Sequence, residues 1–245
     1  MCPALTTITE VPMKPNITTI PITELFTQTD GCPICRMYRM LEEQYVEYIT
    51  GAAMMAPDVR VKTNKVGFCH RHFSMMVNNG PRLSNALLLQ THIEELRNKV
   101  FPKKNTDTPD KKMLAAIREN DHTCYVCDRI EHDILHLLAT VYVQYGSDPE
   151  FRKQYQAQEF ICLDHYALVM GNANKKAMDK STFKDFCEKT NRLSKGYMDT
   201  LYDDVTHFAS MFDYRNRGGD YKNSKDAIER SVRFLTSYPV DENLK

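Results

Sequence analysis

Two short cysteine motifs are each followed, after almost the same interval, by a cysteine–histidine motif. Cys32-Pro33-Ile34-Cys35 precedes Cys69-His70-Arg71-His72, and 33 residues separate them. Cys124-Tyr125-Val126-Cys127 precedes Cys162-Leu163-Asp164-His165, and here the interval is 34 residues. Each half of the chain therefore supplies three thiolates and one imidazole, which is a complete tetrahedral ligand set for zinc.

We expect two zinc ions, one in each half of the chain. The predicted ligands are Cys32, Cys35, Cys69 and His72 for the first ion, and Cys124, Cys127, Cys162 and His165 for the second. Pairing within each half is expected because duplication of a self-sufficient unit explains the matched spacing. His72 is preferred to His70, since Leu163 stands at the equivalent place in the second half.

Other interpretations of the cysteines remain open. An iron–sulfur cluster with mixed cysteine and histidine ligands is the alternative cofactor. The cysteines could also be buried free thiols, or a CxxC pair could catalyse dithiol exchange, although no alternating strand pattern surrounds either pair. His132 and His136 lie one helical turn apart, but Glu131 precedes His132, so the HExxH motif of metalloproteases is absent.

The pattern of the chain predicts an all-α protein made of two tandem helical repeats and a long C-terminal helical region. Apolar residues recur at three- and four-residue steps after Pro33, with Glu42, Glu43 and Glu47 on the polar side. Further helices are expected from residue 82 to 100 and from an N-cap at Ser181 onward. Residues 19–22 are expected to be extended, because a proline at 21 disfavours helix before it.

The duplication extends beyond the predicted ligands and suggests the domain boundaries. Pro57-Asp58-Val59-Arg60 corresponds to Pro149-Glu150-Phe151-Arg152, 92 positions later. We divide the chain into an N-terminal arm (1–28), a first repeat (29–101), a polar linker (102–112), a second repeat (113–216), and a C-terminal helix and tail (217–245). Each repeat is then one supersecondary unit built on one metal.

Composition argues against several classes of function. The 245 residues contain 32 Lys and Arg and 32 Asp and Glu, so no overall charge attracts nucleic acid or an anionic membrane. The chain shows no secretory signal pattern and no apolar run of membrane-spanning length. No phosphate-binding glycine loop or GxSxG motif occurs. We therefore expect a cytoplasmic protein that binds neither membrane nor nucleic acid.

Four stretches of the chain together resemble an uncharacterised bacterial family of unknown function, found mostly in Firmicutes. They are residues 30–35, 67–72, 124–131 and 212–216, and the resemblance runs from about residue 19 to 235. It implies a cytoplasmic, cysteine-rich helical protein and brings no established activity. Gly218-Gly219-Asp220-Tyr221 departs from the Trp-containing turn expected there, as does the arm rich in Thr and Pro.

The function predicted from these features is that of a non-enzymatic metal-binding module with a binding or regulatory role and protein partners. A closed set of four ligands argues against an enzyme, because catalytic zinc keeps one position open for water or substrate. The alternatives are a thiol- or metal-based redox sensor and an iron–sulfur protein. The sequence does not identify the partner or the oligomeric state, which could be a homo-oligomer. It also leaves open whether the ligands pair within or between the two halves.

Overall fold

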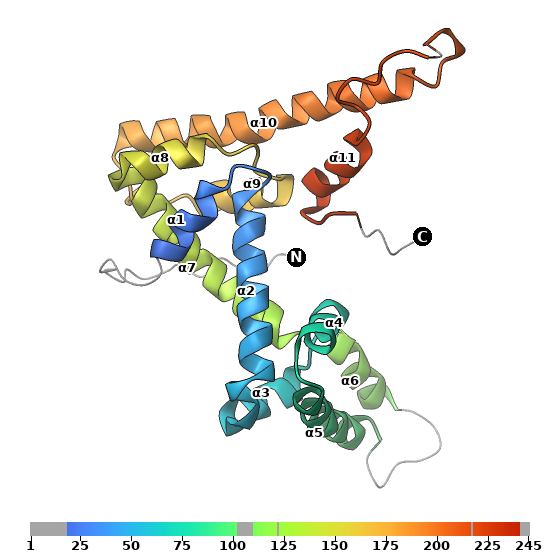
Figure 1. Ribbon diagram of the computed structural model, residues 1–245. Coiled ribbons are helices and arrows are strands. Elements are labelled where there is room, and N and C mark those ends of the chain that lie inside the picture. The colour runs from blue at the N-terminus through green and yellow to red at the C-terminus, as the bar shows by residue number, and fades with distance from the viewer. Residues whose placement is uncertain (1–18, 102–109, 122, 217, 241–245) are drawn as a thin grey trace. The chain divides into compact units, whose positions relative to one another are not determined.

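The computed structural model describes residues 19–101, 110–121, 123–216 and 218–240, and this part of the chain forms helices and no strand (Figure 1). The all-α prediction is confirmed. The α-helices are α1 (Thr19–Thr27), α2 (Pro33–Thr50), α3 (Pro57–Val66), α4 (His70–Asn79), α5 (Arg82–Val100), α6 (Lys111–Asp121), α7 (Tyr125–Ser147), α8 (Pro149–Gln156), α9 (Leu163–Gly171), α10 (Lys180–Ser210) and α11 (Ala227–Thr236). Two 3-10 turns, η1 (Ala52–Met55) and η2 (Tyr214–Asn216), complete the described elements. The predicted arm up to residue 18 and most of the predicted linker lie outside the described residues.

The helices follow the same order in both halves of the sequence. A long helix, α2 or α7, follows each CxxC motif, and the short helices α3 and α8 begin at the matched residues Pro57 and Pro149. Cys69 and Cys162 are the N-caps of α4 and α9, with φ/ψ of −70°/165° and −63°/163°. The internal repeat seen in the motifs is therefore also a repeat of helices.

Two local predictions are wrong. Residues 19–22 are helical instead of extended, because α1 begins at Thr19 and places Pro21 in its first turn, where the missing N–H costs no helical hydrogen bond. The N-cap of α10 is Asp179 instead of Ser181. The Asp179 carboxylate accepts hydrogen bonds from the backbone N–H groups of Ser181 (2.8 Å) and Thr182 (3.0 Å), which satisfies two donors that a helix start leaves unpaired.

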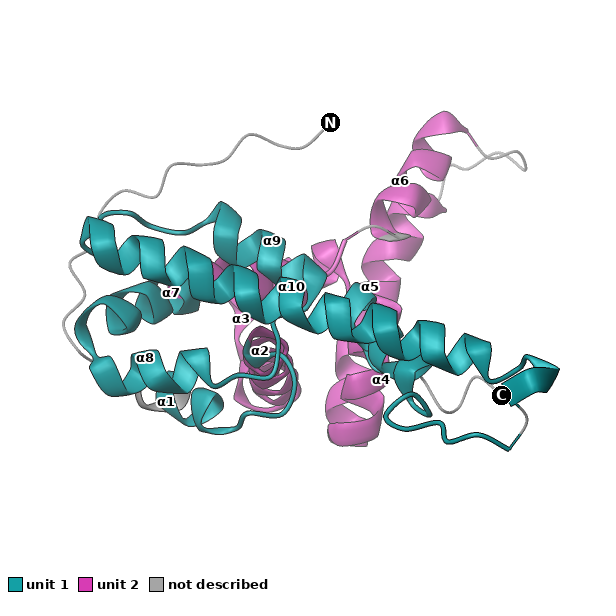
Figure 2. Ribbon diagram, turned by 90° about the horizontal axis from the view of Figure 1, so that it is seen from above, with its two compact units in different colours: residues 1–33, 137–245 teal, residues 34–136 magenta. Residues whose placement is uncertain are grey.

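The chain divides into two compact units, shown in Figure 2. One unit combines residues 1–33 with 137–245, and the other contains residues 34–136. The boundaries fall within α2 and within α7, so each unit takes helices from both halves of the sequence. We call them the split unit and the central unit.

An aromatic cluster forms the core of the split unit. Phe26 of α1 packs on Phe151 and Tyr155 of α8, with ring centroids 4.9 Å and 5.7 Å away. Phe186 of α10 contacts Tyr145 and Tyr155 at 4.9 Å and 5.3 Å. Each of these five side chains is at most 1% exposed, so the hydrophobic effect holds α1 against helices that lie far along the chain.

The central unit is built on the packing of α5 against α3 and α6. The Arg60 guanidinium donates a hydrogen bond to the Leu87 carbonyl at 2.8 Å. His92 Nδ1 lies 2.9 Å from the Asn64 carbonyl oxygen. These contacts fix the end of α3, after which the chain turns into the first cysteine–histidine motif. Among the described helices of both units, none combines the length and apolarity needed to cross a membrane.

Candidate metal centres

The structure gathers the predicted ligand residues into two clusters, but it pairs them differently from our expectation. Site I consists of Cys32, Cys35, Cys162 and His165, and site II consists of Cys69, His72, Cys124 and Cys127. The expectation of pairing within each half is wrong. Each CxxC meets the CxxH of the other half, so both clusters join the two halves of the sequence.

The lengths of the helices explain the exchange. The α2 helix has 18 residues, which carries the chain about 27 Å away from the first CxxC. The return helix α3 has 10 residues and spans about 15 Å, so by itself it falls about 12 Å short of the length of α2. In the second half, the 23 residues of α7 and the 8 of α8 give a larger mismatch. A CxxH motif that follows such a pair of helices is too far from its own CxxC.

Site I is the more deeply buried of the two clusters. Cys32, Cys162 and His165 are buried, and Cys35, on the first turn of α2, is partly exposed. His165 Nδ1 lies 3.0 Å from the sulfur of Cys162 and 3.6 Å from that of Cys32. The sulfurs of Cys32 and Cys162 are 3.7 Å apart.

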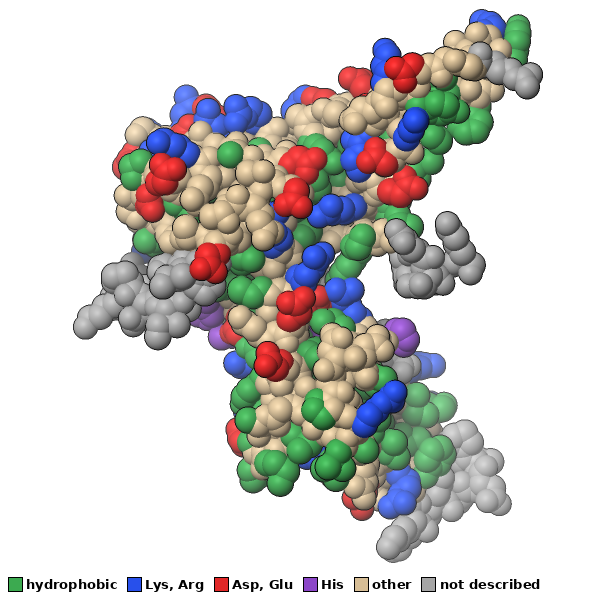
Figure 3. Space-filling model, viewed as in Figure 1, with side chains coloured by type: hydrophobic (Ala, Val, Ile, Leu, Met, Phe, Trp, Pro, Cys, Tyr) green, Lys and Arg blue, Asp and Glu red, His purple; other side chains and the backbone are tan. Residues whose placement is uncertain are grey.

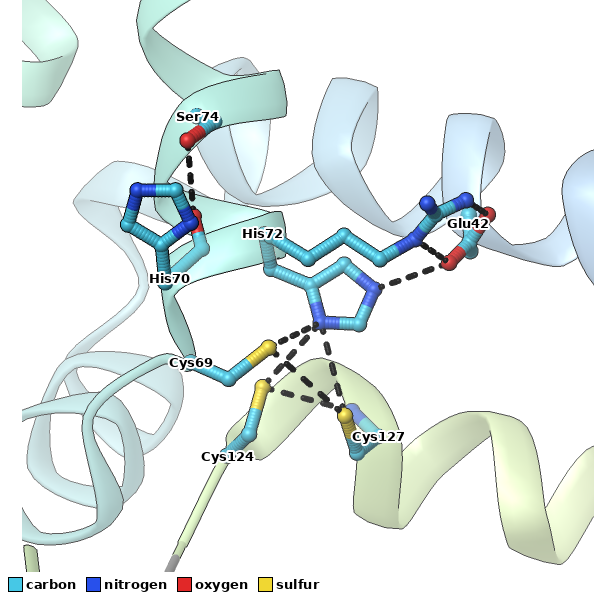
Figure 4. A network of polar contacts seen from close by, with 8 residues as sticks. Glu42, Cys69, His70, His72, Ser74, Cys124 and Cys127 are labelled. Atoms are coloured by element: carbon cyan, nitrogen blue, oxygen red, sulfur yellow. Dashed lines mark hydrogen bonds and ion pairs between the residues drawn. The ribbon is translucent and has the colours of Figure 1, made fainter. Parts of the chain in front are cut away.

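Site II has the same composition, and its residues are drawn in Figure 4. The imidazole Nδ1 of His72 lies 3.2 Å from the sulfurs of both Cys69 and Cys124, and 3.5 Å from that of Cys127. The sulfurs of Cys69 and Cys127 are 3.9 Å apart. These two cysteines are partly exposed, whereas His72 and Cys124 are buried.

These distances fit one tetrahedrally bound ion at each site. Zinc bonds of about 2.3 Å to sulfur and about 2.0–2.1 Å to nitrogen place neighbouring sulfurs about 3.8 Å apart and a sulfur about 3.6 Å from the nitrogen. The sulfur–sulfur distances of 3.7 and 3.9 Å match this geometry. The sulfur–nitrogen distances range from 3.0 to 3.6 Å, so several are shorter than this ideal. All four ligand atoms in each cluster lie within 4.8 Å of one another, so one small cation could contact them all. The described cysteines form no disulfide.

Helix N-termini surround both clusters. Site I lies where α2 and α9 begin, and site II lies where α4 and α7 begin. The start of a helix carries partial positive charge and unpaired N–H groups, both of which stabilise a thiolate. In site II, the Cys127 N–H donates to the Cys124 sulfur at 3.5 Å. The CxxC and CxxH motifs thus place the sulfurs beside backbone N–H groups at the starts of helices.

Backbone hydrogen bonds hold the exchanged motifs together. At site II, the Gly67 carbonyl accepts a hydrogen bond from the Tyr125 N–H at 3.0 Å. At site I, Glu159 donates its N–H to the Thr29 carbonyl at 3.0 Å, and its carboxylate accepts from the Gly31 N–H at 2.6 Å. Each contact connects a residue within or just before a CxxC with a residue just before the CxxH that it meets.

Site II stabilises positive charge on its histidine. Burial alone would lower the pKa of His72, but hydrogen bonds with Cys124 and Glu42 and the negative charge of Cys124 and Cys69 raise it to about 10. The pKa of Cys124 falls to about 3, mainly because Cys127 hydrogen-bonds to its thiolate. The negative charge that favours a proton on His72 would equally favour a metal cation, which takes the place of that proton when it binds.

Site I has the same electrostatic character. Burial opposes protonation of His165, yet hydrogen bonds with Cys162 and Cys32 and the charge of their sulfurs raise its pKa to about 9. The negative potential at both sites therefore comes from thiolates held at short distance from an imidazole.

An ion pair beside site II, with a buried carboxylate and an exposed arginine, was missed at the level of sequence. We placed Glu42 on the polar side of α2, but its side chain is only 8% exposed. Its carboxylate forms two 2.6 Å hydrogen bonds with the Arg71 guanidinium, and one oxygen lies 3.4 Å from His72 Nε2 (Figure 4). Arg71 and these neighbours lower the pKa of Glu42 to about 2 against the opposing effect of burial. The signal in the sequence was Arg71, the basic residue inside the CxxH motif.

Several residues that could have bound metal lie outside both clusters. His70 is exposed and only its backbone carbonyl, which accepts from Ser74, takes part in the network of Figure 4. His132 and His136 stack with ring centroids 4.7 Å apart and belong to neither site. Cys187 of α10 is partly exposed and also belongs to neither site.

Comparisons with known proteins place the chain in a family without assigning it an activity. A family model described as a family of unknown function, DUF6062, matches residues 13–242, so the chain belongs to that family. No curated protein and no solved structure matches it.

Proposed function

We propose that this member of a family of unknown function is a zinc protein whose two closed sites cross-link distant parts of one chain. The observation that carries the proposal is the exchange of motifs between the halves of the sequence. Site I joins residues 133 positions apart and site II joins residues 52 positions apart. Because an ion bound only by the folded chain stabilises that fold, each zinc would contribute directly to folding.

The donor set favours zinc over an iron–sulfur cluster. Three cysteines and one histidine form a common closed zinc site. A cluster needs ligands spread over two or more irons, whereas the four ligand atoms here converge within 4.8 Å. A closed set also leaves no position for a substrate, so we propose a structural role for the ions and no catalysis at them.

The role of the protein would then be that of a binding or regulatory module in the cytoplasm, with a protein as its partner. Three aromatic side chains near the C-terminal end of α10 support this proposal: Tyr202, Phe212 and Tyr214 are 73%, 74% and 85% exposed. Exposed aromatic residues are typical of protein–protein contacts. Charges of both signs are mixed over the face seen in Figure 3, which disfavours nucleic acid.

Metal analysis of protein purified without oxygen tests the proposal. We expect two zinc ions per chain, no visible absorption, and a lower melting temperature after the zinc is removed by a chelator. The variant Cys187→Ser is the matched control, because its thiol lies outside both sites, and it should keep both ions. Iron with visible absorption bands, or a chain that contains no metal, would contradict the proposal.

A second candidate, a redox sensor at site II, is favoured by the exposure of Cys69 and Cys127. Their sulfurs are 3.9 Å apart and both residues are partly exposed. Peroxide could oxidise these two thiolates to a disulfide, and with two protons the peroxide would be reduced to two water molecules. The zinc would then lose two of its ligands and dissociate. Low peroxide should then release one zinc, and a thiol reductant should allow it to rebind. Retention of both ions would exclude this function.

A further inference from the structure

The C-terminal helix α11 has no counterpart in the first half of the chain, and it ends against site I. Its C-cap, Ser237, has φ 64° and ψ 2°, and its backbone N–H closes the helix on the Arg233 carbonyl at 3.0 Å. This left-handed conformation turns the chain at the end of the helix. Ser237 Oγ then lies 3.0 Å from the sulfur of Cys162, a buried ligand residue of site I.

The hydroxyl of Ser237 is well placed to donate to that sulfur. A metal-bound cysteine is a thiolate, which accepts hydrogen bonds and cannot donate them. The Asp164 carboxylate also lies near Ser237 Oγ and can accept from it, at the longer distance of 3.4 Å. The shorter contact therefore directs the hydroxyl proton to the sulfur of Cys162.

A second contact connects α11 with the CxxC side of site I. Gly31, the residue before Cys32, has φ 81°, and a Cβ added to it would lie 2.5 Å from the Arg233 guanidinium. Arg233 thus lies directly on the backbone of Gly31, and it also lies over the Phe160 ring at 6.0 Å from the centroid. One turn of α11 therefore touches both chain segments that supply ligands to site I.

The packing of α11 on its own unit is firm enough to hold these contacts. Phe234 is 1% exposed and lies against Phe160 and Tyr197, with ring centroids 5.7 and 5.6 Å away. Arg230 forms an ion pair with Asp204 of α10 at 2.8 Å, where both side chains are less than one-fifth exposed.

We propose that α11 is a clamp on site I, in which Ser237 donates a hydrogen bond to the metal-bound sulfur of Cys162 while Arg233 braces Gly31. The inference rests on the proposed function, because it requires an ion at site I. A hydrogen bond to a ligand stabilises its thiolate form and slows its exchange with protons or competing chelators. Site II has no such clamp among the described residues; there the Glu42–Arg71 pair lies behind the histidine ligand.

The variant Ser237→Gly distinguishes the effect of the hydroxyl group from the effect of the C-cap conformation. Glycine adopts the left-handed C-cap conformation without strain, so α11 should still end correctly while the donor is lost. Ser231→Ala is the matched control, since it removes a hydroxyl of the same helix that donates to the Ala227 carbonyl at 2.6 Å, away from site I. Ser237→Ala repeats the loss of the donor with a different backbone preference.

The measurement is the rate at which each cysteine is alkylated when the full-length zinc-bound protein is exposed to a chelator. Peptide mass spectrometry follows Cys32, Cys35 and Cys162 separately from the three cysteines of site II. We expect both Ser237 variants to speed alkylation at site I by about 10-fold, the lower end of the effect of losing a partner of a metal ligand, with site II and the control unchanged. Unaltered rates at site I in a protein that holds two zinc ions would overturn the clamp alone. A protein without metal would overturn the clamp and the proposed function together.

Discussion

The backbone carbonyl of Gly67 accepts a hydrogen bond from the N–H of Tyr125, with the two atoms 3.0 Å apart. Gly67 stands two residues before the first CxxH, and Tyr125 lies inside the second CxxC. This hydrogen bond holds the first CxxH motif against the second CxxC motif without any bound ion. The side of Gly67 that a Cβ would occupy is filled by His92, whose ring is anchored on α3.

We predict that Gly67→Ala destabilises the protein and loosens site II. Gly67 has φ 70°, and a Cβ there would lie 2.7 Å from His92 Cε1. The backbone strain alone should cost about 1–3 kcal/mol of the free energy of unfolding. Gly196→Ala in α10 is the control, because its Cβ would meet nothing within 4 Å, and it should stabilise the helix by about 1 kcal/mol. Chemical denaturation measures both, and equal stabilities would contradict the packing described here.

The residues that form the two clusters could be predicted from sequence because their chemistry and spacing are local properties. Two CxxC motifs and two CxxH motifs specify which residues are candidate ligands, and the apolar periodicity specifies the helices. The pairing could not be obtained in this way, since equal intervals in both halves are compatible with either arrangement. It follows from the 18 and 23 residues of α2 and α7 and their short return helices.

Which polar residues are buried also could not be predicted from the sequence. Glu42 shares the polar side of α2 with Glu43, yet only Glu42 is buried. What distinguishes them is the Arg71 guanidinium, which reaches Glu42 from a helix 29 positions away. Periodicity describes one helix at a time and cannot report such a partner.

The Glu42 carboxylate should strengthen metal binding at site II. It lies 3.4 Å from His72 Nε2, so it can orient the ring and increase the basicity of Nδ1 toward the ion. Replacement by glutamine keeps the size and removes the charge. We expect Glu42→Gln to lower the zinc affinity of site II by about 10-fold, as measured by competition with a chelator. The exposed Glu43→Gln is the control; equal affinities in the two variants would refute this role.

The decrease in the free energy of unfolding at acid pH should depend on Asp133. Its carboxylate accepts a hydrogen bond from the Tyr45 hydroxyl and lies 2.7 Å from His132 Nδ1. Burial raises the pKa of Asp133, but these contacts and Arg129 lower it below its ordinary 3.8. A lowered pKa means that the contribution to stability is complete above the unfolded-state pKa and is lost as pH falls through the folded-state value.

The variant Asp133→Asn tests this dependence. Its melting temperature should differ from that of the natural chain by a constant amount above about pH 5, and the difference should shrink below about pH 4. Loss of metal in acid affects both proteins alike, so it cancels in the comparison. A difference that stays constant down to the acid transition would show that the Tyr45–Asp133 contact is not formed in solution.

The exchanged pairing of the motifs is tested most directly by the variant Cys35→Ser, with every cysteine followed by alkylation and peptide mass spectrometry. Cys35 shares site I with Cys162, whereas Cys69 belongs to site II. Loss of one ligand should release one zinc and expose Cys32 and Cys162 to alkylation, while Cys69, Cys124 and Cys127 stay protected by the second ion. Exposure of Cys69 with continued protection of Cys162 would contradict the account, because it would show that each half of the chain binds its own metal.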